Sequence, residues 1–326
     1  MRAAYIDSLG PAAVIRCGDL PAPTPGPGEV LVAVTHSAVN HVDTFVRSGA
    51  WSTPVPFPFV IGRDLVGSVA AVGHGVAGLA PGDRVWCNSL GHDGRQGAAA
   101  EFASVAADRL YPLPDGVDPV DAVAVAHSAA TAHLALFTHG RTRAGDTVVI
   151  VGAGGCVGSA AVVMAAEAGA RVIAVAGAAD AEHCRELGAA VTLDYRADDL
   201  PTQIAVAGPG GVDVHVDAAG RNDLESAVSL LAKRGRLVVL AGMAARPVLP
   251  VGALYLKDCS VVGFAISQAS TAELAEAAVR VNRLLAAGLL RPRRVRGLAL
   301  SEAAEAHRAV ERGGAGGTKV VLAVAS

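Results

Sequence analysis

The sequence predicts a two-domain α/β protein in which an antiparallel β domain precedes a doubly wound, six-stranded parallel sheet. Its 326 residues exceed the ~250–300 residues that a single hydrophobic core usually holds. From about residue 118 onwards, strands alternate with helical segments, which indicates βαβ units. The stretch Thr147–Gly169 joins a strand, a glycine-rich turn and an Ala-rich helix, and the rest of the chain is organised around it.

Composition and charge exclude several classes of protein. The chain is 52% hydrophobic, contains 38 glycines and has a formal net charge of −3, which gives no electrostatic reason to bind nucleic acid or anionic membrane. No apolar run reaches the ~18 residues of a membrane span, and Met1–Tyr5 does not begin a signal peptide. The five cysteines are scattered without a C-x-x-C pair, as a reducing compartment allows. We therefore expect a globular protein of the cytoplasm.

The first 120 residues are expected to form the antiparallel domain. A rigid, proline-rich loop at Pro21–Gly28 follows the first strand, and two later loops, Asn40–Trp51 and Gly91–Gly97, carry the candidate functional side chains. The strands predicted here are Met1–Tyr5, Val30–Thr35, Val66–Val72, Arg84–Cys87, Glu101–Val105 and Arg109–Pro112.

The parallel sheet is predicted from a helix at Val120–Phe137 onwards. Six strands follow, the number found in a complete dinucleotide-binding domain: Thr147–Gly152, Arg171–Ala176, Ala190–Tyr195, Val212–Ala218, Arg236–Ala241 and Ser260–Ile266. A helix at Thr271–Ala287 and a terminal strand at Thr318–Val324 come next. This tail is too short for a third domain, so we expect it to return to the first one.

The glycine-rich turn predicts a dinucleotide site. The β-branched run Thr147–Val151 is typical of a buried parallel strand, and it leads into Ala153-x-Gly155-x-x-Gly158, a G-x-G-x-x-G pattern with alanine first. The small residues allow a tight turn, an open approach for a pyrophosphate and close packing of helix on strand. A helix beginning near Cys156 directs free backbone N–H groups at the phosphates.

Several motifs together resemble the medium-chain dehydrogenase/reductase superfamily, and in it the zinc-free quinone oxidoreductase (zeta-crystallin-like) branch. Asn40–Gly49 resembles the branch's N-x-x-D-x-x-x-R-x-G segment, and Phe57–Gly67 its P-F-x-x-G-x-D-x-x-G segment. Ala153–Gly158 and Asp194–Arg196 resemble its A-x-G-x-x-G and N-Y-R motifs. Strands like those at Asp217–Gly220 and Gly235–Gly242 are also found in the branch. The resemblance implies a GroES-like antiparallel β-barrel catalytic domain at 1–121, a Rossmann cofactor domain at 122–265 and a return segment at 266–326.

The resemblance also implies a function. It implies NADPH-dependent, metal-free reduction of quinones or α,β-unsaturated carbonyls by a homodimer. Two alternatives remain open, a biosynthetic enoyl or enone reductase and a non-catalytic NADPH-binding protein of the crystallin or RNA-binding type. The catalytic cleft that it implies is lined by Asn40, Asp43, Phe45, Arg63 and Thr131, to which we add His127. The cofactor positions that it implies are Ala153, Gly154, Gly155, Cys156, Val157, Gly158, Gly177, Tyr195, Arg196, Ala219, Gly242 and Phe264.

The residues at the metal positions of zinc-dependent relatives do not favour zinc. The three positions fall on Asn40, Arg63 and His127. An arginine cannot ligate the ion, and asparagine is a poor ligand beside cysteine, histidine or a carboxylate. The structural-zinc cysteine cluster is absent from the sequence as well, so we expect no metal.

The end of the second parallel strand favours NADPH over NADH. NAD enzymes place an Asp or Glu there to hold the ribose 2′-hydroxyl, whereas this strand ends Val175-Ala-Gly177-Ala178. The resemblance places Tyr195 and Arg196 beside a 2′-phosphate. Asp180 carries the opposite charge from the lysine that the family often has nearby, and His183 and Arg185 can compensate for it.

Arg63 and His127 are the candidates for polarising a substrate carbonyl, because a guanidinium or protonated imidazole stabilises an enolate oxygen in a dry site. Arg63 can alternatively hold Asp43 or a phosphate, and His127 can be an ordinary buried histidine. Asp43 also suits a helix N-cap, and Asp64 a structural hydrogen bond.

Three further features have plain structural interpretations. Cys156 suits a small buried filler, and Lys257–Asp258 suits surface charge, although related enoyl reductases have a Lys/Asp pair there. The basic cluster at Arg291–Arg296 suits a solvated edge rather than a nucleic-acid site.

Overall fold

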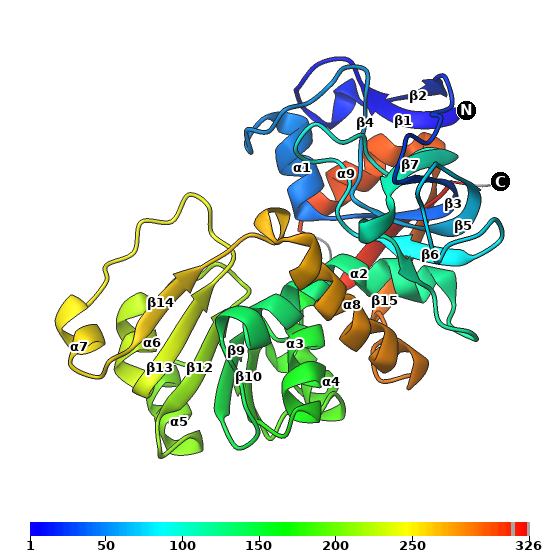
Figure 1. The fold of residues 1–326 in the computed structure, drawn as a ribbon. Helices are drawn as coiled ribbons and strands as arrows, with labels where there is room; N and C mark the ends of the chain where they lie inside the picture. The colour runs from blue at the N-terminus through cyan, green and yellow to red at the C-terminus, as the bar shows by residue number, and fades with distance from the viewer. Residues whose placement is uncertain (314–316, 325–326) are drawn as a thin grey trace. The chain divides into compact units, whose positions relative to one another are not determined.

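The computed structural model describes residues 1–313 and 317–324. The chain divides into two compact units, one of Met1–His127 with Leu274–Ser326 and one of Ser128–Glu273 (Figure 1). The first unit is β-rich and is built from both ends of the chain. The second is a continuous α/β segment.

The first unit is organised around one long strand. This strand, β3 (Glu29–Val39), pairs antiparallel with β5 (Asp64–Val72), with β7 (Phe102–Ala106) and with the terminal strand β16 (Thr318–Ala323). The larger sheet has the order β15-β16-β3-β5-β6-β8, in which β15 is Arg294–Ala299, β6 is Arg84–Cys87 and β8 is Tyr111–Pro112. A smaller sheet has the order β2-β1-β4, comprising Arg16–Asp19, Arg2–Ile6 and Phe59–Val60.

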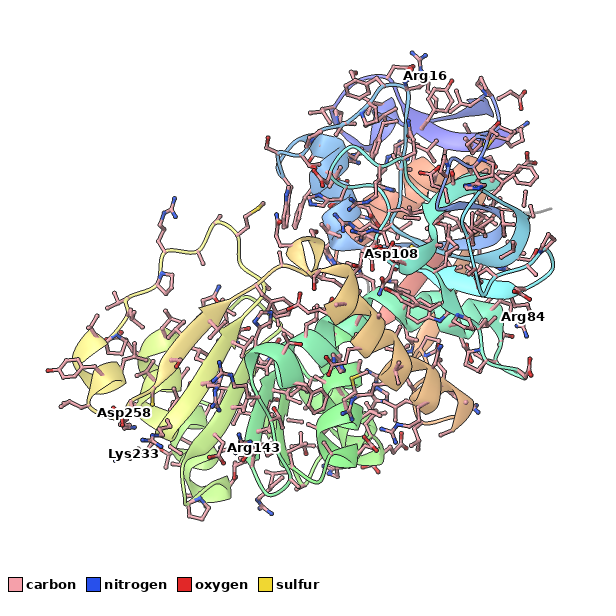
Figure 2. All side chains as sticks on the ribbon, viewed as in Figure 1. Arg16, Arg84, Asp108, Arg143, Lys233 and Asp258 are labelled. Carbon is pink, nitrogen blue, oxygen red and sulfur yellow. The ribbon has the colours of Figure 1, made fainter. Side chains whose placement is uncertain are left out.

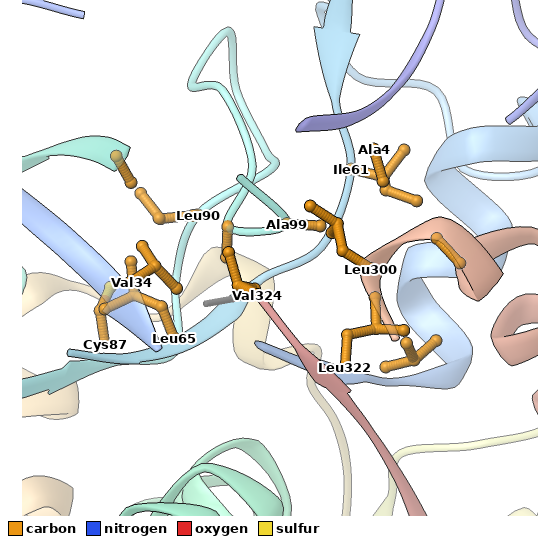
Figure 3. Packing of buried hydrophobic residues seen from close by; sticks show 14 of the residues in the cluster. Ala4, Val34, Ile61, Leu65, Cys87, Leu90, Ala99, Leu300, Leu322 and Val324 are labelled. Atoms are coloured by element: carbon orange, nitrogen blue, oxygen red, sulfur yellow. The ribbon is translucent and has the colours of Figure 1, made fainter. Parts of the chain in front are cut away.

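The core of this unit draws on residues from both ends of the chain, from Ala4 to Leu110 and from Leu300 to Val324. Figure 3 shows Val34, Leu65 and Cys87 together on neighbouring strands. Leu322 of β16 and Val324, which follows this strand, belong to the same core. Burying a side chain of this kind stabilises the fold by roughly 1.5–3 kcal/mol. The terminal segment therefore contributes to the core as well as to the sheet.

The second unit has the predicted parallel sheet. Its strand order is β11-β10-β9-β12-β13-β14, the doubly wound order of a dinucleotide-binding fold, and every pairing in it is parallel. The strands are β9 (Thr147–Val151), β10 (Arg171–Ala176), β11 (Val191–Asp194), β12 (Val212–Asp217), β13 (Leu231–Val239) and β14 (Ser260–Gly263). The β-branched runs of β9, β10 and β12 are buried on both faces, which explains why they lack alternation.

Most predicted helices are present, with ends that differ by a few residues. The segment predicted at Val120–Phe137 is α2 (Pro119–His133) continued by a π-helical stretch, Leu134–His139. The tail helix is α8 (Thr271–Ala286). The others are α3 (Cys156–Glu167), α4 (Ala181–Glu186), α5 (Leu200–Ala207), α6 (Leu224–Leu230), α7 (Val251–Tyr255) and α9 (Ala303–Glu311).

Two parts of the local structure differ from expectation. Asn40–Trp51 is not a loop throughout, because α1 (His41–Ser48) occupies most of it. Strands β2, β4 and β15 were not predicted, since they are short and their sequences lack a clear alternation. The stretch Pro119–His139 is long and apolar enough for a membrane span by composition, but 78% of its most apolar window is buried in the structure.

Candidate functional site

The turn after β9 has the geometry of a phosphate cradle. Gly152 adopts φ +81°, a conformation that favours glycine, and a Cβ on Gly158 would lie 2.1 Å from the carbonyl oxygen of Gly152. Only glycine at position 158 therefore lets α3 approach the strand this closely. The helix begins at Cys156, and its first N–H groups have no partners within the helix. This turn fits the pyrophosphate of a dinucleotide.

The ends of β10 and β11 bring charged groups together beside this turn. A Cβ on Gly177 would lie 3.6 Å from Cε1 of Tyr195 and 3.8 Å from Nη1 of Arg196. The guanidinium carbon of Arg196 lies 4.5 Å from the centroid of the Tyr195 ring, and that of Arg221 lies 5.3 Å from it. Two cations thus gather at the tyrosine that the resemblance places beside a 2′-phosphate.

Asp180 opposes this positive charge. A Cβ on Gly154 would lie 2.5 Å from Oδ2 of Asp180, so the carboxylate lies directly over the glycine turn. His183, one of the residues expected to compensate, is next to Ser159, with Nε2 and Oγ 3.3 Å apart. Arg185 pairs with Glu182 instead, on the exposed surface. Arg196 and Arg221 add positive charge against the Tyr195 ring.

The loops that follow β12 and β13 are tied to one another. Asp217 accepts hydrogen bonds from the backbone N–H groups of Ala219, Gly220 and Asn222, at 2.6–2.9 Å. The Asn222 amide donates to the carbonyl of Ala241 at 3.1 Å, and a Cβ on Gly242 would lie 2.1 Å from Nδ2 of that amide. This network holds the predicted cofactor positions Ala219 and Gly242 next to each other. Phe264 stacks on His139, with centroids 4.5 Å apart.

In the first unit, the start of α1 is a buried polar cluster centred on Asn40. The backbone N–H of Asn40 donates to Oδ2 of Asp43 at 2.7 Å, which is half of a capping box. Its side-chain Nδ2 donates to Oδ2 of Asp64 at 2.9 Å and approaches Oδ2 of Asp43 at 3.4 Å. Its side-chain oxygen accepts a hydrogen bond from the ammonium of Lys319. Asn40 therefore uses both ends of its amide within the protein.

Arg63 joins the cluster through a carboxylate. Its Nε lies 3.8 Å from Oδ1 of Asp43, with both side chains almost fully buried. Among the described residues, Nε and Nη2 of Arg63 have no hydrogen-bond partner, although the residue is only 1% exposed. Asp43 stands at the third helical position rather than at the N-cap, where Asn40 is found. A buried guanidinium with unused N–H groups is costly unless an acceptor reaches it.

Asp64 and His127 lie together at the same cluster. Nδ1 of His127, on α2, lies 3.8 Å from Oδ1 of Asp64. Burial raises the pKa of Asp64 to about 7, although the Lys319 ammonium acts to lower it. The pKa of His127 lies well below 6.5, because of burial and then the charges of Lys319 and Arg63. His127 is therefore neutral near pH 7, and the expectation that it supplies a protonated imidazole was wrong.

The structure brings together four of the six predicted catalytic residues: Asn40, Asp43, Arg63 and His127. Phe45 is half-buried on α1. Thr131 is buried on α2 one turn after His127 and falls in the second unit. Asp64, which was given a structural interpretation, is bonded directly to Asn40.

Lys257 has a structural role. Its ammonium donates to the carbonyl of Ser229 at 2.8 Å and to that of Leu231 at 3.0 Å, at the end of α6. Asp258 comes just before β14, and Figure 2 shows it near Lys233, which lies at the beginning of β13. This is the end of the sheet at which the strands begin. Ligands of such sheets bind at the opposite, carboxyl ends.

Sequence reasoning missed two residues of these sites. Lys319 is the lone charge inside an otherwise apolar strand, Thr318–Ala323, and it is buried. This combination is itself a signal, since a buried lysine needs a partner. Arg221 gave no comparable signal, because only the fold brings the loop after β12 to Tyr195.

The donor set does not fit zinc. Where a metal ligand would be needed, the cluster holds an arginine, and the amide oxygen of Asn40 is already bonded to an ammonium. Two cations in one buried cluster also oppose the entry of a third. Within the described part of the chain, no three His, Cys, Asp or Glu side chains are grouped so that they can hold a metal ion.

Comparisons with known proteins agree with the fold of both units. A family model for the alcohol dehydrogenase GroES-like domain matches residues 26–115, and one for zinc-binding dehydrogenases matches residues 156–282. The quinone oxidoreductase of Mus musculus is 30% identical over 99% of this chain and 97% of its own length.

Two solved structures with the same fold are described with different nicotinamide cofactors, NAD and NADPH. An NAD-dependent alcohol dehydrogenase is 33% identical with a TM-score of 0.89, over 100% of both chains. A mycobacterial protein solved with NADPH is 29% identical with a TM-score of 0.84, over 99% of this chain and 100% of its own. The comparisons thus support a nicotinamide cofactor without distinguishing the two forms.

Proposed function

Because the chain belongs to the quinone oxidoreductase branch of the medium-chain dehydrogenase/reductase superfamily and is an oxidoreductase, we propose that it reduces quinones or α,β-unsaturated carbonyls with NADPH, without a metal. Its curated mouse relative carries the name quinone oxidoreductase. The finer assignment of acceptor, cofactor form and mechanism is our own.

The observation that carries the proposal is the buried Arg63 guanidinium. Two of its N–H-bearing nitrogens lack a partner in the described structure, so they can donate to a ligand oxygen. A carbonyl oxygen that gains negative charge during reduction is such an acceptor. A donor fixed in advance in a water-free site stabilises that charge far more than water does.

When bound, NADPH would supply the hydride for a quinone or for the β-carbon of an enone. The electron pair then moves to the acceptor oxygen, which Arg63 stabilises through its free N–H groups. The enolate or hydroquinone anion still needs a proton. His127 is neutral at pH 7, so the group in this cluster that loses a proton near neutrality is Asp64.

The charges around Tyr195 support NADPH. Arg196 and Arg221 both lie against the tyrosine ring, and a 2′-phosphate would add the negative charge that these cations attract. Asp180 lies beside the same glycines and would repel that phosphate. Asp194 is a second carboxylate here, with its Oδ1 3.9 Å from Nη1 of Arg196, so Arg221 is the cation that most favours the phosphorylated cofactor.

The enone reductase alternative is supported by the same cluster. Enone reduction concentrates charge on one oxygen, which suits a single strong donor such as Arg63. A non-catalytic cofactor-binding protein has no use for a buried guanidinium with unused donors. The structure of the cluster therefore favours the catalytic proposals over that one.

A homodimer is part of the same proposal. Strand β14 lies at the end of the six-stranded sheet. Nearby, α7 and its following turn expose Tyr255 (65%) and Leu256 (75%). An apolar surface beside an open strand edge suits pairing with a second copy. Light scattering on the purified chain should give twice the 32.6 kDa mass of one chain.

The decisive experiment is a steady-state assay of NADPH and NADH oxidation. Benzoquinones, enones and saturated ketones should be offered in parallel, before and after exhaustive chelation. We expect turnover with the first two classes, preference for NADPH and no loss on chelation. Turnover of saturated alcohols or ketones that depends on stoichiometric zinc would overturn the proposal.

A further inference from the structure

Lys319 occupies a fixed place opposite Asn40. Val320 of β16 is paired with Val39 of β3 in the antiparallel register, so the preceding residue on one strand faces the following residue on the other. Lys319 is 6% exposed, and its ammonium donates to the side-chain oxygen of Asn40. The return strand therefore places a buried cation next to residues almost 280 positions earlier.

The hydrogen bond from Lys319 decides which way the Asn40 amide faces. With the oxygen held by the ammonium, Nδ2 is directed at the carboxylates of Asp64 (2.9 Å) and Asp43 (3.4 Å). A rotated amide would place its oxygen against those carboxylates, which is unfavourable. Lys319 thus fixes the donor that both acids depend on.

Lys319 also acts on Asp64 by its charge. Asp64 is fully buried and is faced by Asn40 and Asp43 from α1, by the adjacent Arg63, by His127 from α2, by Cys87 from β6 and by Lys319. Of the neighbours that favour the ionised carboxylate, the lysine has the largest effect, ahead of Asn40 and Arg63.

We propose that Lys319 is a positioning residue for the reduction proposed above, which orients the Asn40 amide toward the carboxyls of Asp43 and Asp64 and stabilises the ionised form of Asp64 by its charge. The inference rests on the proposed function for its catalytic consequence. Its structural part, the effect of Lys319 on Asp64, stands independently of any substrate.

The test compares Lys319→Met, Lys319→Arg and the control Lys233→Met, which changes an exposed lysine of the second unit. Without the cation, the pKa of Asp64 should rise above about 7. The midpoint of the pH–rate profile should therefore move to higher pH in Lys319→Met by at least one pH unit. In Lys319→Arg, which keeps the positive charge, the midpoint should lie close to that of the wild type. Lys233→Met should match the wild type.

Carbonyl-stretch infrared titration of Asp64, identified by its loss in Asp64→Asn, gives a readout that needs no substrate. An unchanged Asp64 midpoint in folded Lys319→Met overturns the inference. If Lys319→Met does not fold, the same titration on Lys319→Gln decides, since the neutral amide removes the cation but keeps a donor for the Asn40 oxygen, and the midpoint should again move to higher pH. If no acceptor is reduced at all, the proposed function fails while the titration still tests Lys319.

Discussion

The two candidate sites of this molecule are built in opposite ways. The dinucleotide turn uses backbone and glycines from one short stretch, Gly152–Gly158, and its shape follows from local conformation. The polar cluster uses the side chains of α1, β5, α2 and β16, which only the finished fold brings together. A site made of backbone accepts few residue types, because most side chains would block it. A site made of side chains depends instead on which residues contact one another.

Gly158→Val should produce the largest effect, because it breaks the backbone site. The new side chain would meet the Gly152 carbonyl oxygen at 2.1 Å, a contact with backbone that no rotamer relieves. We expect a loss of stability of about 1–3 kcal/mol or more and no measurable cofactor binding. Thermal unfolding and fluorescence titration measure both. Gly210→Ala, which meets nothing within 4 Å, is the control.

Arg63→Ala tests the side-chain site and should leave the other intact. Removing one preorganised donor of this kind typically lowers turnover by about 10²–10³. We expect this loss with an enone and with a benzoquinone, and unchanged NADPH affinity. Arg16→Ala, an exposed arginine of the same unit, should behave as wild type. Near-normal turnover in Arg63→Ala would contradict a catalytic role and would mean that Arg63 only neutralises the charge of Asp43.

The preference for NADPH over NADH tests the side chains that surround the glycine turn, separately from the turn itself. Arg221→Ala removes one of the two cations at Tyr195, and we expect roughly tenfold weaker NADPH binding with NADH unchanged. Asp180→Asn should change affinity in the opposite direction, by a smaller factor. Equal effects on both cofactors would mean that Arg221 only stabilises the loop.

The smallest expected effect is the change of stability with pH. It comes from a buried histidine of the second unit, whose pKa is lowered by burial, whereas burial raises the pKa of Asp64. Burial lowers the pKa of His215 on β12 to about 4, against 6.5 when unfolded. Its stabilising contribution is complete above pH 6.5 and is lost as the pH falls toward 4, by about 1 kcal/mol at pH 5.5. His215→Gln should flatten this part of the stability curve in denaturant titrations. A wild-type curve that is already flat contradicts the prediction.

Much of the fold and the backbone site could be predicted from the sequence. The strand Arg171–Ala176 agrees with the prediction to the residue, and β9 ends one residue before the predicted Thr147–Gly152. The helix expected to begin near Cys156 begins there. Each of these elements rests on a continuous local pattern. The short strands β2 and β15 were missed because tertiary pairing, not local preference, makes them strands.

The side-chain site could be predicted only in part. Asn40 and Arg63 were found through motifs, but their mutual arrangement depends on Lys319, which no local pattern links to them. The protonation of His127 was predicted wrongly, because it depends on burial and on the neighbouring cations. Interactions between charges on distant segments of the chain can be known only once the folded structure places those segments side by side.

The return of β16 to β3 has a consequence for how the protein is made. The second unit is one continuous segment and can fold during synthesis, but the first unit lacks β16 until the ribosome has passed residue 323. Until then, the edge of β3 at His36–Val39 stays open, and an open edge invites pairing with other chains. Contacts between segments so far apart form slowly. Nascent chains should therefore become resistant to protease first in the second unit.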